Sequence, residues 1–112
     1  MAAANITSRL ERHAEQLAAL GAPVRLAILR HVVQGHRDGT PVGDLQSKLD
    51  IPWSTLSHHI DRLTSAGLLT QRRDGRFLFC RAEYTALRAL TDYLWEDCCK
   101  GGDTKASKKG CC

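Results

Sequence analysis

The dipeptide Asp74-Gly75 stands between two segments of alternating side chains, and no other feature restricts the fold of this chain as strongly. The two segments are residues 68–73 and 76–81. Asp-Gly is a preferred pair for the two-residue type I′ turn, which joins antiparallel strands and needs positive φ angles at both central residues. The sequence therefore predicts a β-hairpin whose turn is Asp74-Gly75, with arginines on both sides of its tip.

Helical periodicity surrounds the predicted hairpin. Apolar side chains recur in five segments at the spacing of an amphipathic helix. These segments are residues 5–20, a segment from Pro23 to a stop at Gly35, a short one after Pro41, residues 53–66 and residues 83–97. Helix, short helix, tight turn, helix and hairpin is the order of a winged helix-turn-helix. We therefore expect a fold that is mainly α with a small β-hairpin.

Three of these helices have apolar faces that bear on how they pack. The first has one apolar stripe, made of Ile6, Leu10, Ala14 and Leu17. The second is apolar nearly all round, as a central core helix should be. In the fourth helix Leu56, Ile60 and Leu63 are expected to face inward, and Gly67 suits the position just after its end, where a left-handed conformation costs least.

Length and charge limit the remaining possibilities. With 112 residues and 43% hydrophobic residues, the chain fits one small domain over residues 1–99 and a flexible tail over residues 100–112. It has neither a run of 18 apolar residues nor a secretory leader, so we expect a cytoplasmic protein that does not enter a membrane. The net charge of +4 comes largely from four lysines in residues 98–112. Overall charge is therefore weak evidence for nucleic acid, and local placement must decide.

The outer face of the fourth helix has the chemistry of a DNA reader. Small hydroxyls, a histidine and an arginine can enter a major groove without steric conflict and can bond to base edges and phosphates. Arginines at the hairpin tip can reach flanking phosphates or the minor groove. The predicted contacts are Ser54, Thr55, Ser57, His58, Arg62, Arg72, Arg73 and Arg76. Taken singly, each of these could equally be an ordinary solvated residue. His59, next to inward-facing Ile60, is expected to be structural.

Four short motifs resemble the ArsR/SmtB repressors, small bacterial winged-helix dimers. They are residues 57–63 (Ser-His-His-Ile-Asp-Arg-Leu), 66–69 (Ala-Gly-Leu-Leu), 73–76 (Arg-Asp-Gly-Arg) and 22–25 (Ala-Pro-Val-Arg). The resemblance covers about residues 10–100. It implies a homodimer built from the first and last helices, bound to double-stranded operator DNA. Dimeric readers of this kind place two half-sites about 34 Å apart. No spacing of a nucleophile and a base stands out in the sequence, and its five histidines are scattered over different segments, so we do not expect an enzyme.

Members of the family bind their effectors at different places in the fold. The positions of one arsenic site are occupied here by Pro41 and Gly43, which are not ligands, and residues 83–97 lack the histidine of the zinc site. The pair Cys98-Cys99 instead resembles a subset of arsenite-responsive repressors, with adjacent cysteines at the end of the last helix and a third further on. This resemblance implies As(III), and by extension Sb(III), as the effector, with no resident cofactor.

Thiolate chemistry is consistent with that effector, because soft thiolate ligands select soft ions. Cys111 or Cys112 could supply a third thiolate after a loop of eleven residues, 100–110, whose closure costs little more than that of a shorter loop. All four cysteines together could instead hold tetrahedral Cd or Zn. A thiol redox sensor is the other alternative. Cys80 alternates with Phe77 and Phe79 and is expected to be a packed residue.

Overall fold

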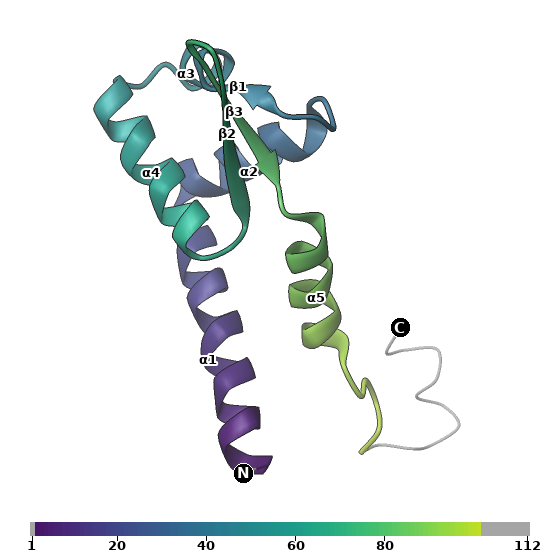
Figure 1. The fold of residues 1–112 in the computed structure, drawn as a ribbon. Helices are drawn as coiled ribbons and strands as arrows, with labels where there is room; N and C mark the ends of the chain where they lie inside the picture. The colour runs from purple at the N-terminus through teal and green to yellow at the C-terminus, as the bar shows by residue number, and fades with distance from the viewer. Residues whose placement is uncertain (1, 102–112) are drawn as a thin grey trace.

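The computed structural model describes residues 2–101, and for residues 2–7 it describes the backbone alone. Five helices and a three-stranded antiparallel sheet, with strand order β1-β3-β2, make up this part of the chain (Figure 1). The elements are α1 (Ala2–Leu20), α2 (Pro23–Gln34), β1 (Thr40–Pro41), α3 (Val42–Leu49), α4 (Trp53–Ser65), β2 (Leu69–Asp74), β3 (Phe77–Ala82) and α5 (Tyr84–Trp95). The predicted mainly α fold with a hairpin is confirmed.

The hydrophobic core lies where α2, α3, α4 and the base of the hairpin meet. Its largest fully buried side chains are Ile28, Val32, Leu45, Leu56, Ile60, Leu63, Leu68, Leu69 and Cys80. The three inward residues predicted for α4 are among them. The second helix is less enclosed than predicted, because Leu26 and Val33 remain 45% and 41% exposed. Only one face of α2 therefore contributes to the core of a single protomer.

Backbone geometry at both ends of α4 fixes its direction. Asp50, in the left-handed region at φ 53°, ends α3, and Pro52 precedes the first residue of α4. At the other end the Leu68 N–H donates to the Leu63 carbonyl at 3.0 Å, and the Gly67 N–H donates to the Thr64 carbonyl at 2.9 Å. This pair of bonds is a Schellman motif, and Gly67 has the positive φ of 80° that it requires.

The sheet differs from the sequence prediction in two ways. The strand β1 pairs with β3, with Thr40 opposite Cys80, and sequence reasoning missed it. The hairpin turn lies one residue later than predicted, because Asp74 pairs with Phe77 and the two turn residues are Gly75 and Arg76. Gly75 has a φ of 65° and Arg76 does not have a positive φ. A positive φ at the first central residue alone is the pattern of a type II′ turn, not type I′.

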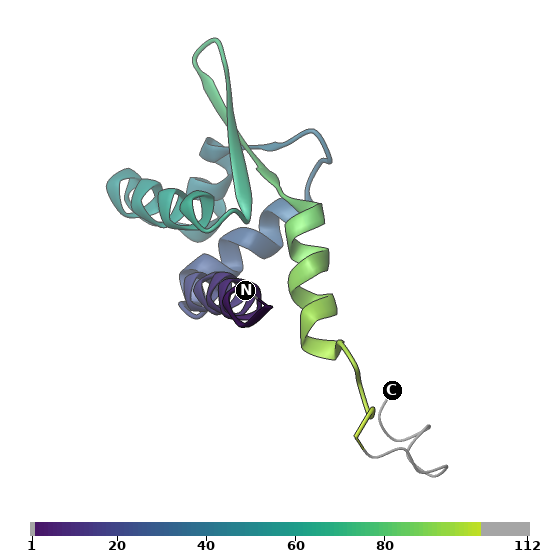
Figure 2. The same ribbon diagram turned by 60° about the horizontal axis from the view of Figure 1, so that its bottom comes forward.

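The helices α1 and α5 extend from the same side of the core (Figures 1 and 2). The expected apolar stripe of α1 does not face the core, since Leu10 and Leu17 are 52% and 44% exposed. The buried face of α1 carries His13, Gln16 and Ala19 instead. In residues 2–101 no single helix is long and apolar enough to cross a membrane; the bent pair Ser8–Leu20 and Pro23–Gln34, at 96°, meets those criteria only when taken together.

Candidate nucleic-acid interface and thiol segment

The outward residues of α4 form one polar surface, which we call the reading face. It consists of Ser54, Thr55, Ser57, His58 and Arg62. All are exposed except Ser57, which is half-buried, while Leu56, Ile60 and Leu63 on the opposite side are buried. The second helix of the helix-turn-helix thus presents hydroxyl, imidazole and guanidinium groups to solvent. Trp53 lies at the start of α4 and is 47% exposed.

Arg25 ties the reading helix to the rest of the fold. Its Nε donates to the Ala19 carbonyl at 2.6 Å, and its Nη1 donates to His59 Nδ1 at 3.3 Å. The pKa of His59 is lowered, first by burial and then by the charges of Arg25 and of His58. A neutral His59 keeps the lone pair that accepts this bond. The expected structural role of His59 therefore has a partner, which sequence reasoning did not identify.

The hairpin tip presents arginines in two different states. Arg72 is held: its guanidinium lies 4.6 Å from the centre of the Phe79 ring, and its Nη2 donates to the Asp38 carbonyl at 3.4 Å. Arg73 and Arg76 have neither an ion pair nor a hydrogen bond from their side chains to any residue in the described range 2–101. Figure 2 shows the hairpin projecting beyond α4 as a wing, so these two guanidinium groups are placed for an external anion.

The thiol segment, residues 96–101, follows α5 and does not continue it. The helix ends at Trp95, two residues before the predicted end, and successive turns follow, with left-handed φ angles at Asp97 and Cys99. Cys98 and Cys99 are half-buried, and their Sγ atoms lie 3.5 Å apart.

The proposed ligand set is only partly visible. Cys111 and Cys112 lie outside the described residues, as does the rest of the predicted tail beyond Gly101. Within residues 2–101 there is no group of three or more His, Cys, Asp or Glu side chains placed to hold a metal. Cys80 belongs to the core, as predicted: it is fully buried, and burial raises the pKa of its thiol to about 11.

A set of side chains joins the thiol segment to α1; we call it the α1–α5 bracket. Glu96 Oε1 accepts from Arg9 Nη2 at 2.8 Å, and the same guanidinium lies over the Tyr93 ring at 5.0 Å. The Tyr93 ring in turn packs on His13, with centroids 4.4 Å apart. Because Arg9 faces Glu96, the pKa of that carboxyl is lowered.

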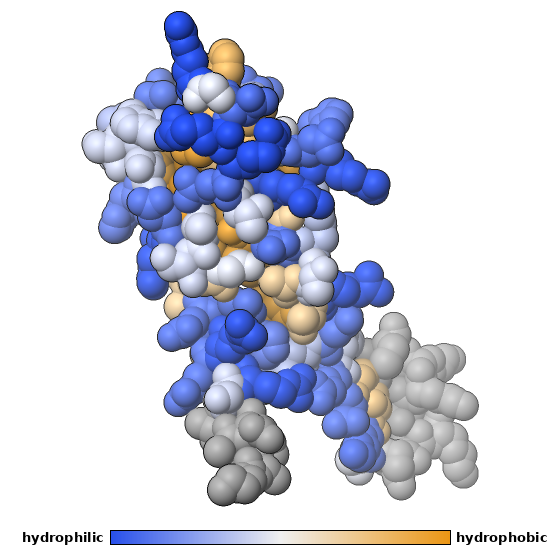
Figure 3. Space-filling view, in the orientation of Figure 1, coloured by the Kyte–Doolittle hydropathy of each residue, from blue (hydrophilic) through white to orange (hydrophobic). Residues whose placement is uncertain are grey.

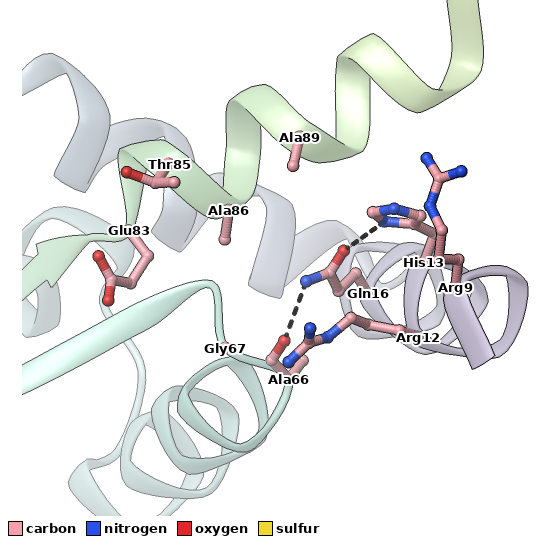
Figure 4. A pocket seen from close by; sticks show the side chains of 10 residues that line it. All are labelled: Arg9, Arg12, His13, Gln16, Ala66, Gly67, Glu83, Thr85, Ala86 and Ala89. Carbon is pink, nitrogen blue, oxygen red and sulfur yellow. Dashed lines mark hydrogen bonds between the residues drawn. The ribbon is translucent and has the colours of Figure 1, made fainter. Parts of the chain in front are cut away.

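The bracket continues to the end of α4. Gln16 Oε1 accepts from His13 Nδ1 at 3.0 Å, and Gln16 Nε2 donates to the Ala66 carbonyl at 3.4 Å (Figure 4). Gln16 and His13 border a groove of 540 Å³ between α1 and α5. Sequence reasoning missed this set, because polar residues on a helix are expected to face solvent. Their three-residue spacing on one face is the signal that could have indicated a shared contact.

A helix-turn-helix with a basic wing, an exposed polar reading helix and two projecting arginines defines the class: a winged helix-turn-helix regulator that binds DNA. Residues 20–72 match a family model described as a helix-turn-helix domain. A biofilm growth-associated repressor of Agrobacterium fabrum is 35% identical over 86 residues, which are 72% of this chain and 71% of that protein. The chain belongs to the ArsR/SmtB family of winged helix-turn-helix transcriptional repressors.

Two further similar proteins carry different descriptions. A Halobacterium salinarum protein that carries the name of an arsenical resistance operon repressor is 33% identical over 63 residues, covering 56% of this chain and 52% of that protein. The chain thus spans about half the length of that relative. A homodimeric winged helix-turn-helix DNA-binding domain from Mycobacterium bovis has a TM-score of 0.64 and 26% identity, covering 81% of this chain and 84% of that domain. Repressors of this family are not enzymes.

Proposed function

We propose that this protein is a homodimeric repressor that leaves its operator when As(III), or the chemically similar Sb(III), binds thiolates of the thiol segment. The proposed ligands are Cys98, Cys99 and one or both of Cys111 and Cys112. The observation that carries the proposal is the 3.5 Å separation of the two adjacent sulfurs, on a segment that the Arg9–Glu96 pair fastens to α1. A repressor that acts on double-stranded DNA in this way is expected in the cytoplasm.

The DNA-binding part of the proposal rests on charge and shape. In each protomer the reading face enters a major groove and the wing follows the adjacent backbone, with Arg62, Arg73 and Arg76 neutralising phosphates. Each phosphate contact releases counterions, so binding is expected to weaken steeply as the salt concentration rises. Two protomers related by a two-fold axis read two half-sites about one helical turn apart.

The donor set suits the effector. Thiolate ligands favour soft ions over Mg²⁺, Ca²⁺ and Mn²⁺, and As(III) takes three of them in a pyramid. Two sulfurs on neighbouring residues already lie 3.5 Å apart, in a segment of turns rather than in a helix. Bringing a third sulfur to the same ion restrains that segment. Because Glu96 lies two residues before Cys98 and is bonded to Arg9, the restraint acts on the position of α5 against α1.

The energy required is modest for such a site. Moving a population from 99:1 bound to 99:1 free requires about 5.5 kcal/mol of difference in effector affinity between the two states. Two sites in a dimer share this requirement. Linkage also requires that operator DNA weaken effector binding by the same factor by which the effector weakens DNA binding.

The test measures release of a fluorescent operator duplex by arsenite, in the presence of a non-chelating phosphine reductant. The duplex is one selected from a random library with the wild-type protein. Cys98→Ser and Cys99→Ser are expected to bind the duplex with wild-type affinity and to resist release. The matched control is Cys80→Ala, which removes a thiol that lies in the core and should be released normally.

Other outcomes would change the assignment. Release of both serine variants by arsenite at the wild-type concentration would contradict the proposed ligands. Release by peroxide but not by arsenite would indicate a redox sensor. Release by Cd²⁺ that requires all four of Cys98, Cys99, Cys111 and Cys112 would indicate the tetrahedral alternative.

A further inference from the structure

Phe77 is the one large apolar side chain exposed at the wing tip within the described part of the chain. It follows the turn residue Arg76 directly and is 61% exposed. In Figure 3 a small hydrophobic patch lies among strongly hydrophilic atoms at the end of the molecule where the hairpin turns. Leaving a phenylalanine in water forgoes burial of its large apolar surface, and no contact within residues 2–101 encloses this ring.

The dimer expected for this family does not account for the exposure. Its helices, α1 and α5, extend from the side of the core away from the hairpin tip (Figure 1). The large exposed apolar residues of α5, Leu94 and Trp95, lie on that other side and are 60% and 62% exposed. Phe77 therefore needs a different partner, and its neighbours indicate which one.

Two arginines belong to the wing tip around Phe77. Arg76 precedes it at the turn, and Arg73, opposite Leu78, projects from the other face of the hairpin, because successive residues of a strand point to opposite faces. Neither guanidinium has an ion pair or hydrogen bond within the described residues. A polyanion is therefore the partner that the charges of the tip favour. Asp74, opposite Phe77, is paired with Arg72 at 3.7 Å, so its charge is compensated.

The Phe77 ring also lies next to a second ring that is itself held in place. Phe79, two residues along the same strand face, has its centroid 6.5 Å from that of Phe77. Phe79 is itself covered by Arg72, whose Nη2 bonds to the Asp38 carbonyl. A side chain beside such a ring loses little conformational freedom when it docks, and this favours binding.

We infer that Phe77 is a DNA contact, whose ring packs against sugars and base edges in the minor groove beside each half-site. Apolar side chains used in this way partly separate base steps and widen the groove. The contact makes binding depend on how easily the DNA deforms. Operators with flexible pyrimidine–purine steps at the wing position are therefore preferred over operators with stiff A-tracts there. The inference rests on the DNA-binding mode proposed above and assigns it a residue that carries no charge.

The absence of charge gives the contact a signature of its own. A phosphate contact contributes to the dependence of affinity on salt, with about one unit of slope lost per contact removed. A ring that packs on sugars displaces no counterion. Removing Phe77 is therefore expected to lower affinity equally at every salt concentration, whereas removing Arg76 lowers the slope as well.

The experiment measures affinity for the selected operator duplex by fluorescence anisotropy across a salt series. Phe77→Ala is expected to weaken binding about tenfold, or about 1.4 kcal/mol, with the wild-type slope. Phe77→Leu, which keeps an apolar wedge, should restore most of the loss. Leu26→Ala is the matched control, since it removes an exposed apolar side chain of α2 and should change neither affinity nor slope. Thermal unfolding of Phe77→Ala should match wild type, because the ring does not pack in the core.

A second measurement reports on the DNA. A 2-aminopurine base at the step under the wing is expected to brighten when wild-type protein binds and to stay dim with Phe77→Ala. Unchanged affinity of Phe77→Ala, or a loss confined to the salt slope, would overturn the inference. Loss of self-association with DNA binding intact would assign the ring to a protein interface and also overturn it.

The same series separates this inference from the proposed function. If Arg62→Ala and Arg76→Ala weaken binding and lower the slope while Phe77→Ala does neither, only the inference about Phe77 is wrong. If Arg62→Ala and Arg76→Ala also bind as wild type does, the proposed DNA-binding mode is wrong, and the inference fails with it.

Discussion

At the scale of single residues, the cysteines show that the same side chain has different roles at different places in the fold. Cys80 is enclosed by the core and pairs across the sheet with both Gln71 and Thr40. Cys98 and Cys99 are half-buried in a segment of turns with their sulfurs in contact. Alternation with Phe77 and Phe79 was enough to predict the core role of Cys80. A thiol kept neutral by burial is a poor nucleophile and a poor ligand, which fits the packing role predicted for Cys80.

The raised pKa of Cys80 predicts a loss of stability at alkaline pH. Its folded pKa of about 11 exceeds the ordinary value of 9.0, so above pH 9 the unfolded chain releases a proton that the folded chain retains. Stability therefore falls as the pH rises from 9 to 11. Two pKa units correspond to about 2.7 kcal/mol, an upper bound on the effect. Chemical unfolding of wild type and Cys80→Ala at each pH measures it.

The comparison with Cys80→Ala isolates the thiol, since every other titratable group is the same in both proteins. The alanine variant is expected to be less stable at pH 7, because it leaves a small cavity, by about 1 kcal/mol. The difference between the two proteins should shrink as the pH rises towards 11. A difference that stays constant would show that the thiol is not held neutral by the fold.

At the scale of elements, periodic segments could be predicted and non-local pairings could not. The spacing of apolar residues located α2, α4 and α5 within one or two residues. The strand β1 has only two residues, so no period exists in it, and its residue Thr40 pairs with Cys80, 40 positions further along the chain. Periodicity identified the apolar stripe of α1 without saying what covers it. Within the protomer, α1 packs through His13 and Gln16.

The hairpin turn was misplaced for an energetic reason. A turn at Asp74-Gly75 would set Arg73 directly opposite Arg76, and like charges in that position repel. The observed register sets Arg73 opposite Leu78 and Arg72 opposite Phe79, where the guanidinium covers the ring. The cross-strand pairs therefore outweigh the preference of Asp-Gly for the two turn positions. The same shift places Arg76 at the apex of the wing.

A pair of glycine substitutions tests the assigned turn. Gly75→Ala is expected to destabilise the protein by about 1–2 kcal/mol, because its φ of 65° is left-handed. Gly43→Ala is expected to stabilise it by about 0.5 kcal/mol, because Gly43 lies in α3 and nothing lies within 4 Å of an added Cβ. Denaturant midpoints measure both. Equal destabilisation by the two alanines would contradict the assigned geometry of the turn.

At the scale of the whole molecule, a single protomer is more extended than a domain of its size should be. Its radius of gyration is 17.3 Å over the described residues, against about 13 Å for a compact domain of 100 residues. The excess comes from α1 and α5, which extend away from the core (Figure 1). These helices expose Leu10, Leu17, Leu94 and Trp95, which are 44–62% accessible. We predict that a second copy of the chain covers these apolar faces.

Charge placed on those faces should therefore dissociate the protein and weaken its hold on DNA. Leu17→Glu and Leu94→Glu are each expected to shift wild-type dimers towards monomers in sedimentation velocity, because each removes about 1.5–3 kcal/mol of apolar burial per protomer and introduces a charge. Leu26→Glu, on α2, is the control and should remain dimeric.

The effect on DNA should depend on the number of half-sites. Linked protomers bind a duplex with two half-sites more tightly than either protomer binds one, because the second contact becomes intramolecular. Monomeric Leu17→Glu should therefore lose affinity for the two-site duplex by at least tenfold and keep wild-type affinity for a duplex with one half-site. If the double variant Leu17→Glu, Leu94→Glu still sedimented as a dimer, the assembly would use another surface, and α1 and α5 would need a different explanation for their exposed leucines.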